Sequence, residues 1–396
     1  MDDIAWGTDA ELTDEQFYNR GEEILWIKNI LETTSKGSPP TIMLVGIRGV
    51  GKTVLIKKIK KELESDYLIC YTDLSATSGY QMGKLTEISI MEDLFDCWVK
   101  EFRGRKLPTA HKKLSKLLTT KNYGLREIID VGGYPIPIPK SEDDYKKLSK
   151  FVLDLPQKAF EEHSDKISGV ILIIDEFQVL KDLGERLDAF LWFLRSVIQN
   201  QKNVAYVFSG SLTSTDSIVA KIAGGEGAFG GRMLNVEIAP FTQETVKNYL
   251  KEKLPSLIFK EDGFHRFYQC TKGIPYYVNT FAKLLKKDVP LGDEEVKDEF
   301  YRTLPFLAVD LINQWGRLSL QEQTIVTILV DKPLRRKEIA EKLGVTTGSL
   351  GAPFKKLQER RLIKSHEGVY TISEPILKAW LVKEHKDKGV FPFRGT

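Results

Sequence analysis

Short, mostly apolar runs and amphipathic stripes alternate through the first 240 residues of the chain. Short runs of mostly apolar residues are typical of strands that are covered on both faces of a sheet. They occur at residues 41–45, 67–71, 170–174, 204–208 and 233–238. Apolar positions at helical spacing lie between them, at residues 17–31, 54–63 and 186–199. This alternation predicts an α/β fold built on a doubly wound parallel sheet.

The same pattern divides the chain into three parts. Residues 1–240 carry the strand–helix alternation and form the predicted core, with a mostly helical, charge-rich excursion at about 79–165. After Pro240 the apolar spacing is purely helical, which predicts a small helical lid at 241–316. Residues 317–396 have the pattern of three helices and a hairpin, which is typical of a winged helix-turn-helix.

The composition is that of a globular protein. Of its 396 residues 42% are hydrophobic and 29% charged, and no apolar run approaches the roughly 20 residues that cross a bilayer. The first residues are acidic where a signal peptide is basic, so we expect a cytoplasmic protein. Cys70, Cys97 and Cys270 are few, odd in number and widely spaced, which predicts neither a disulfide framework nor a cysteine metal site.

One glycine-rich segment has the pattern of a phosphate-binding loop. Residues 46–53, Gly-Ile-Arg-Gly-Val-Gly-Lys-Thr, satisfy G-x-x-x-x-G-K-[ST] between an expected strand and an expected helix. Glycines leave backbone N–H groups open to a phosphate, and the helix N-terminus adds its dipole. Lys52 can reach the β- and γ-phosphates, and the Thr53 hydroxyl can bind Mg²⁺. The predicted nucleotide contacts are Gly46, Ile47, Arg48, Gly49, Val50, Gly51, Lys52, Thr53 and Val54.

A pair of acidic residues directly follows one of the apolar runs. Asp175 and Glu176 directly follow the run at 170–174. Beside a phosphate loop, an aspartate in this position holds the hydrated metal ion, and a glutamate after it polarises the attacking water. We therefore predict that Asp175 helps to bind Mg²⁺ and that Glu176 is catalytic.

Two further segments flank expected strands. Ser209 and Ser211 follow the run at 204–208, and ligands of doubly wound sheets lie beyond the carboxyl ends of strands. Either hydroxyl can therefore contact the γ-phosphate, although both serines also fit a plain turn. Arg232 precedes the run at 233–238, where it can stabilise phosphate charge, in its own subunit or in a neighbour, or be a surface arginine.

The C-terminal part is the basic part of the chain. Residues 317–396 hold 16 Lys/Arg and 9 Asp/Glu, a net +7 in a chain of net +3, which fits an anionic partner or a solvated surface. Gly348, Gly351 and Pro353 interrupt the expected recognition helix, so it should begin near Ala352 and be short. DNA and protein are thus both candidate partners. The candidate phosphate contacts are Arg335, Arg336, Lys337, Lys355, Lys356, Arg360 and Arg361.

Together these motifs resemble those of one family. Residues 17–23, Phe-Tyr-Asn-Arg-Gly-Glu-Glu, are similar to the F-x-N-R-x-x-E entry of prokaryotic, largely archaeal, P-loop ATPases of the STAND division of AAA+-like proteins. The Ser-Gly-Ser turn, the Gly-Arg before the last strand and Ala-Pro-Phe at 239–241 follow that family's order. Residues 273–277 are similar to its G-x-P-x-Y segment in the lid. The resemblance covers most of the chain outside about 79–165.

The resemblance implies an ATP-driven switch with a core ATPase, a helical lid and a winged helix, and with ATP or ADP and Mg²⁺ as ligands. In that family the Asn-Arg segment borders the adenine site and the lid proline lies near the nucleotide, so Asn19, Arg20 and Pro275 become candidate contacts. The related archaeal origin-recognition initiators carry an arginine in the lid as a second sensor. Residues 273–275 lack one, which weighs against an initiator.

Three functions follow from these patterns. The first is a slow ATPase switch with Lys52, Glu176 and Arg232 as catalytic residues and Ser209 as a phosphate sensor. The second is a DNA-binding regulator or initiator that uses nucleotide as a conformational ligand. The third is a scaffold whose protein partner docks on the excursion at 79–165. Each leaves a homo-oligomer open, and none requires a membrane.

Overall fold

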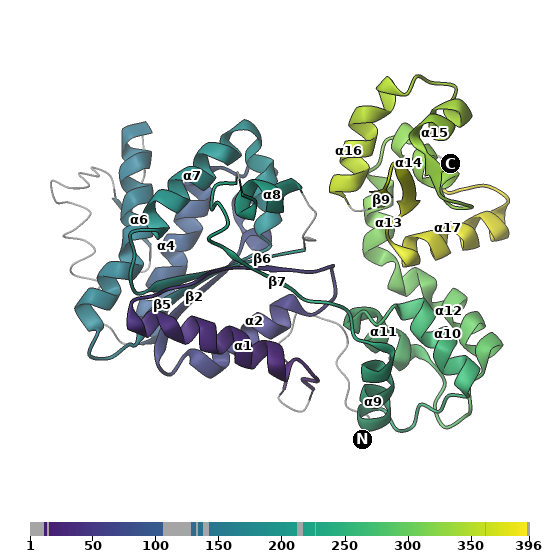
Figure 1. Ribbon diagram of the computed structural model, residues 1–396, viewed down its shortest axis with the longest axis horizontal. Coiled ribbons are helices and arrows are strands. Elements are labelled where there is room, and N and C mark those ends of the chain that lie inside the picture. The colour runs from purple at the N-terminus through teal and green to yellow at the C-terminus, as the bar shows by residue number, and fades with distance from the viewer. Residues whose placement is uncertain are drawn as a thin grey trace. The chain divides into compact units, whose positions relative to one another are not determined.

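The computed structural model describes residues 12–13, 16–105, 128–131, 134–137, 142–211, 217–225, 227–360 and 362–393. Arg361 and much of the predicted excursion therefore lie outside the described residues. The chain forms two compact units (Figure 1). We call residues 19–239 the core unit, and residues 12–18 together with 240–393 the C-terminal unit. None of the helices in the described part of the chain combines the length and the apolar character needed to cross a membrane.

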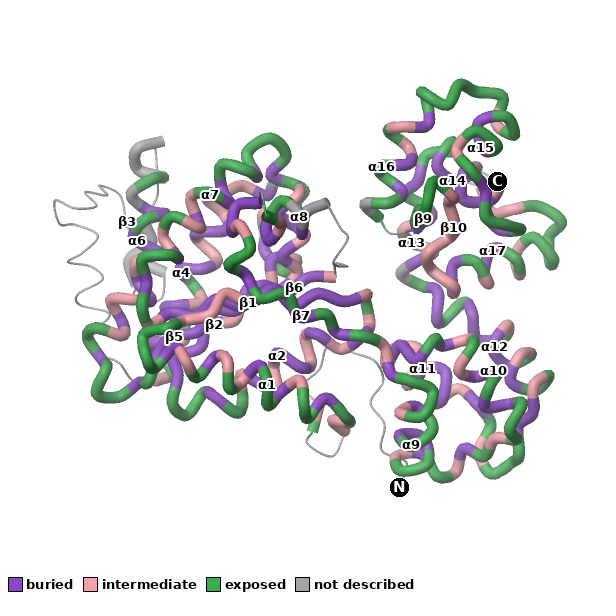
Figure 2. The backbone as a smooth tube through the Cα atoms, viewed as in Figure 1, coloured by how far each residue is buried: buried purple, intermediate pink, exposed green. Residues whose placement is uncertain are grey.

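A five-stranded parallel sheet forms the centre of the core unit, in the order β2-β5-β6-β1-β7. Strands β5 and β6 are buried along their whole length, as their unbroken apolar runs predict. Only one of the four residues of β7, one of the two edge strands, is buried (Figure 2). The strands are β1 (Thr41–Val45), β2 (Tyr67–Asp73), β5 (Gly169–Asp175), β6 (Val204–Gly210) and β7 (Leu234–Glu237).

Helices cover both faces of this sheet, which confirms the predicted α/β fold. Figure 1 shows α1 and α2 on one face and α4, α6 and α7 on the other. Alternate strand residues such as Met43, Leu172 and Tyr206 pack against α4, α6 and α7 in one apolar core. The helices are α1 (Gly21–Glu32), α2 (Lys52–Leu63), α3 (Ser78–Gln81), α4 (Glu87–Gly104), α6 (Glu142–His163), α7 (Leu187–Ile198) and α8 (Ser217–Ala223). Shorter elements are η1 (Thr33–Lys36), η2 (Leu74–Ala76), η3 (Phe177–Arg186) and the hairpin of β3 (Ile128–Val131) with β4 (Tyr134–Pro137).

Two local predictions were wrong. The expected helix at 17–31 begins only at Gly21, because Asn19 (φ 61°) and Arg20 (φ 70°) have left-handed backbone, which cannot continue a right-handed helix. Cys70 on β2 and Cys97 on α4 form a disulfide, with their Cα atoms 5.9 Å apart, although no disulfide framework was expected. Their pairing depends on the packing of α4 against β2, which their spacing in the sequence does not reveal.

The C-terminal unit packs the lid helices and the winged helix around one continuous apolar core. The Trp315 and Trp380 rings meet edge to face, and the Tyr277 hydroxyl donates to the Glu374 carboxylate at 3.0 Å. The helices are α9 (Gln243–Lys253), α10 (Glu261–Thr271), α11 (Pro275–Leu284), α12 (Asp293–Leu307), α13 (Val309–Gly316), α14 (Leu320–Ile328), α15 (Arg336–Leu343), η4 (Gly348–Leu350), α16 (Gly351–Glu359) and α17 (Pro375–Lys388). The wing is a three-stranded sheet of β8 (Leu334–Arg335), β10 (Val369–Ile372) and β9 (Ile363–His366).

Candidate active site

The loop between β1 and α2 contains backbone conformations that glycine adopts readily and other residues rarely do. Gly49 (φ 79°) and Gly51 (φ 98°) have left-handed backbone, which glycine adopts without steric cost. A Cβ atom on Gly46 would lie 2.7 Å from the carbonyl oxygen of Ile238, so close packing requires glycine there. Helix α2 begins at Lys52, directly after the loop, and its positive N-terminal dipole therefore adjoins the loop.

Lys52 is buried, with 5% of its surface exposed. Its Nζ atom donates to the carbonyl oxygens of Gly46 at 2.9 Å and Ile47 at 3.2 Å. It also donates to the Ser211 hydroxyl at 3.3 Å. The ammonium group thus lies against the loop backbone and reaches the residue that follows β6.

The two predicted metal ligands are hydrogen-bonded to each other. The Thr53 hydroxyl donates to Oδ2 of Asp175 at 2.8 Å, and Asp175 is almost fully buried at the end of β5. The Tyr71 hydroxyl donates to the same carboxylate oxygen at 3.0 Å. A hydroxyl and a carboxylate oxygen are the hard ligands that Mg²⁺ prefers, so this pair fits the predicted ion.

Glu176 lies next to this pair in a strained conformation. Its φ of 54° is unusual for a residue with a side chain. Burial raises the pKa of its carboxyl group, and the charge of Asp175 raises it further, whereas the Gln178 hydrogen bond and the Lys52 charge lower it. The Gln178 side chain donates to Oε2 of Glu176 and accepts from the Ser211 backbone N–H at 3.1 Å.

Ser209 lies within β6 and Ser211 directly follows it, and of these two predicted serines Ser211 makes the contact with the loop. Ser209 is fully buried, and its hydroxyl has no hydrogen-bond partner among the described residues. Ser211 is half-buried and accepts from Lys52. Positions two residues apart point to the same face of an extended strand, so the alternating pattern in the sequence does not distinguish Ser209 from Ser211.

The structure does not bring Arg232 to this cluster. Strand β7 runs parallel to β1, with Glu237 beside Val45, so the residues before β7 lie at the amino edge of the sheet. The loop follows β1 at the opposite, carboxyl edge. The five residues of β1 span roughly 16 Å at ~3.3 Å per residue. Within its own core unit, Arg232 is therefore a strand length away from Lys52.

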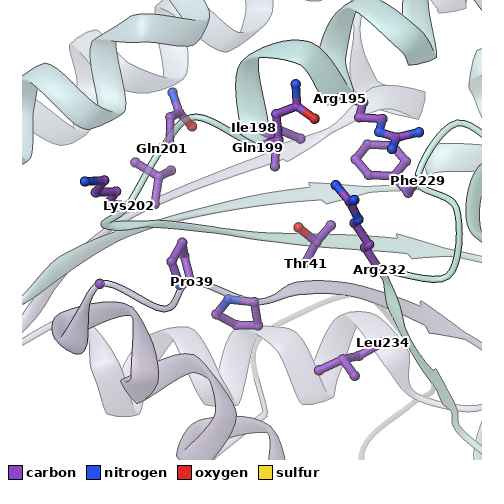
Figure 3. A pocket seen from close by; sticks show the side chains of 13 residues that line it. Pro39, Thr41, Arg195, Ile198, Gln199, Gln201, Lys202, Phe229, Arg232 and Leu234 are labelled. Atoms are coloured by element: carbon purple, nitrogen blue, oxygen red, sulfur yellow. The ribbon is translucent and has the colours of Figure 1, made fainter.

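Arg232 instead lines a cleft of about 430 Å³ at the amino edge (Figure 3). Arg195 and Lys202 are the other charged residues among its described lining. Arg195 donates to the carbonyl oxygen of Ala228 and lies over the Trp192 ring. The charged groups of this cleft are thus cations from three different segments.

The residues predicted to border the adenine lie apart from the phosphate loop in sequence. Arg20 is 8% exposed, and its guanidinium donates to Glu23 at 3.0 Å and to the carbonyl oxygen of Ala239. Asn19 precedes it with left-handed backbone. Pro275 is the first residue of α11, directly after Gly273 (φ 69°) and Ile274 in the C-terminal unit.

Sequence reasoning missed two residues of the site, Tyr71 and Gln178. Tyr71 lies inside β2, in a run that reads only as apolar core. Gln178 follows Glu176 by two residues, and its polar side chain between buried Phe177 and Val179 was the available signal.

Residues 17–281 match a family described as an ATPase domain predominantly from Archaea. The chain belongs to this archaeal ATPase family. The match includes the phosphate loop, the Asp175–Glu176 pair and the Gly-x-Pro segment of the lid. No curated protein matches the chain.

Two solved structures are similar to this chain over nearly its whole length. A Walker-type ATPase of Pyrococcus abyssi has 18% identity and a TM-score of 0.63, with 93% of this chain and 97% of that chain covered. The ORC2 protein of Aeropyrum pernix, solved in ADPNP–ADP complexes, has 11% identity and a TM-score of 0.52, with 95% and 98% covered. At these identities the similarity shows a common fold.

Proposed function

We propose that this archaeal ATPase binds ATP with Mg²⁺ and hydrolyses it slowly, as a molecular switch of the STAND type. The observation that supports this function most is the meeting of Lys52, Asp175 and Glu176. These residues come from α2 and from the end of β5, far apart in the sequence, and all lie at the carboxyl edge of one parallel sheet. Ligands of doubly wound sheets bind at this edge.

Each of these residues has a role in phosphoryl transfer to water. The Lys52 ammonium would bind the β- and γ-phosphates. Their charged oxygens accept hydrogen bonds more strongly than the backbone carbonyl to which Lys52 now donates. Thr53 and Asp175 would hold Mg²⁺, and the bound ion would neutralise phosphate charge. Glu176 would orient and polarise the attacking water.

The remaining predicted contacts complete the nucleotide site in this proposal. The backbone of residues 46–51 and Val54 would surround the phosphates, with Ser211 or Ser209 near the γ-phosphate. Asn19, Arg20 and Pro275 would border the adenine, as in the family that the motifs resemble. Arg232 would serve only the nucleotide of a neighbouring subunit, because the sheet separates it from its own loop.

The switch itself rests on the C-terminal unit. Its lid helices and winged helix share one core, and the contacts of Tyr277 with Glu374 and of Trp315 with Trp380 join them. We infer that the lid and winged helix reorient together, as one body, when the nucleotide changes. Packed interiors resist continuous deformation, which favours movement of whole units.

The first test is ATP turnover by the full chain, measured by phosphate release with Mg²⁺ and with excess EDTA, each with and without duplex DNA. The proposal expects slow, Mg²⁺-dependent turnover that DNA does not require. No turnover and no Mg²⁺-dependent ATP binding would contradict it. Turnover that appears only with DNA would favour the alternative below.

The alternative is an ATP-regulated DNA-binding protein. Exposed Lys355 and Lys356 on α16 favour it, since cations at a recognition helix can contact phosphates. Arg336 does not add to this surface, because its guanidinium packs over the Phe354 ring, 5.7 Å from the ring centre, with its Nε atom buried. Fluorescence anisotropy with a labelled duplex at 50 and 200 mM salt, with and without ATP, tests this function. Absence of binding at low salt would exclude it.

A further inference from the structure

Gln178 connects the proposed water-polarising carboxylate to the chain segment after β6. Its side-chain N–H donates to Glu176, and its side-chain carbonyl accepts from the Ser211 backbone. The direction of both bonds is unambiguous, because a carboxylate only accepts and a backbone N–H only donates. A single amide thus joins two polar groups that directly follow two neighbouring strands, β5 and β6.

The position of Gln178 is set by its apolar neighbours. Phe177 is 1% exposed, and its ring lies 4.5 Å from that of Phe208 on β6. Val179 is also buried. The start of η3 is therefore packed against β6, and the half-buried amide between these residues has little freedom to move away.

Ser211 continues the connection to the phosphate loop. Its hydroxyl accepts from Lys52 at 3.3 Å, while its backbone N–H bonds to Gln178. A γ-phosphate oxygen is a stronger acceptor for an ammonium than a hydroxyl is, so it would compete with Ser211 for Lys52. The segment that touches Gln178 thus adjoins the group that would contact the γ-phosphate.

Glu176 needs a hydrogen-bond donor such as Gln178 to keep its carboxylate in the site. It follows Asp175 directly, and the two negative charges repel each other. Without a donor, its side chain would gain solvation and lose repulsion by turning toward water. The hydrogen bond from Gln178 reaches only Oε2, which leaves Oε1 as an acceptor for a water molecule.

We propose that Gln178 is a positioning residue that holds the Glu176 carboxylate in its catalytic orientation and ties that orientation to Ser211 beside the phosphate loop. This inference rests on the proposed ATPase function. Gln178 itself touches no phosphate group in this scheme, so its loss should act on turnover and not on ATP binding.

The test compares kcat and KM for Mg²⁺–ATP in the wild type and in Gln178→Met, which keeps the length of the side chain and removes both hydrogen bonds. One charge-assisted bond is lost, so kcat should fall roughly 10- to 100-fold while KM stays within about threefold. Gln178→Glu keeps the acceptor for Ser211 but places a second negative charge beside Glu176, so kcat should fall at least as far. Gln321→Met, at an exposed position on α14, is the matched control and should behave as the wild type.

A double variant separates this inference from the proposed function. If Gln178 acts only through Glu176, the Glu176→Gln/Gln178→Met variant should be no slower than Glu176→Gln alone. Unchanged or increased kcat in Gln178→Met, or losses that multiply in the double variant, would overturn the positioning role and leave the ATPase function intact. Full turnover by Glu176→Gln alone would remove the proposed role of Glu176 and that of Gln178 with it. A thermal melt of each variant shows whether the core unit remains folded.

Discussion

At the carboxyl edge of the sheet the polar residues bond to one another, whereas at the amino edge the charged residues line an open cleft. Thr53, Asp175 and Glu176 belong to the first edge, with Lys52 among them. Arg195, Lys202 and Arg232 belong to the second, and all three are cations. The difference follows from topology, because parallel strands gather the residues that follow them at one edge and those that precede them at the other.

This comparison separates two kinds of candidate residue. The carboxyl edge holds opposite charges, donors and acceptors from several elements, which is what binding of a nucleoside triphosphate and hydrolysis of its phosphoanhydride bond require within one molecule. At the amino edge, the described residues that line the cleft include three cations and no acidic side chain. On this account a residue there contributes to catalysis only through a second copy of the chain.

The largest expected effect comes from Lys52→Ala. Removing the buried ammonium deletes its contacts with two phosphate groups, so ATP affinity should fall on the order of 100-fold or more. Titration of a fluorescent ATP analogue in the presence of Mg²⁺ measures this change. Lys61→Ala, on the exposed side of the same helix, is the matched control, and Lys202→Ala tests the amino edge. A loss of affinity in Lys202→Ala equal to that in Lys52→Ala would erase the distinction between the edges.

A smaller effect is expected from Arg232→Ala. Turnover should fall roughly tenfold or more, and only at protein concentrations at which the chain self-associates, while ATP affinity stays at the wild-type value. Mixing Arg232→Ala with Lys52→Ala should restore part of the activity, because each supplies what the other lacks. Wild-type turnover by Arg232→Ala at every concentration would make this residue a surface arginine.

The smallest effect concerns a carboxylate at neither edge. Asp93 on α4 is half-buried, and its Oδ2 atom has no hydrogen-bond partner among the described residues. Burial raises its pKa from 3.8 to about 6, with smaller contributions from Asp96 and Glu92. Glu176 shares the raised pKa but has Gln178 as a donor.

The sign of the pH dependence follows from the direction of this shift. The folded chain binds the Asp93 proton more tightly than the unfolded chain, so the stability gained from it is present below about pH 4 and is lost as the pH rises to about 6. Asp93→Asn should therefore stabilise the protein at pH 7.5 by about 1 kcal/mol, after allowing for its partial exposure, and not at pH 4. Urea unfolding at the two pH values measures this, with Asp165→Asn, at an exposed position, as the comparison. Equal effects at both pH values would contradict the assignment.

The carboxyl-edge site could be predicted from sequence because its parts are local patterns at strand ends. The loop at 46–53 and the pair Asp175–Glu176 each follow an apolar run, and parallel strands then place them together. The strands with their approximate bounds and the winged helix were also predictable, because apolar runs and helical spacing are likewise local patterns in the sequence. Arg232 precedes its strand, and this alone places it at the other edge.

The rest depended on tertiary packing. The disulfide between Cys70 and Cys97 requires α4 to lie on β2, and the bond from Tyr71 to Asp175 requires β2 beside β5. The role of Gln178 depends on its hydrogen bond with Ser211, which β6 places beside it. None of these contacts leaves a periodic signal in the sequence.

The most direct test of the central claim is a paired measurement on Glu176→Gln, of Mg²⁺–ATP affinity by titration and of phosphate release by the same preparation. The account predicts an affinity within about threefold of the wild type, because the Lys52, Thr53 and Asp175 groups remain, and a turnover at least about 100-fold lower. Phosphate release at the wild-type rate would contradict the assignment of Glu176 and, with it, the carboxyl edge as the place where ATP is hydrolysed.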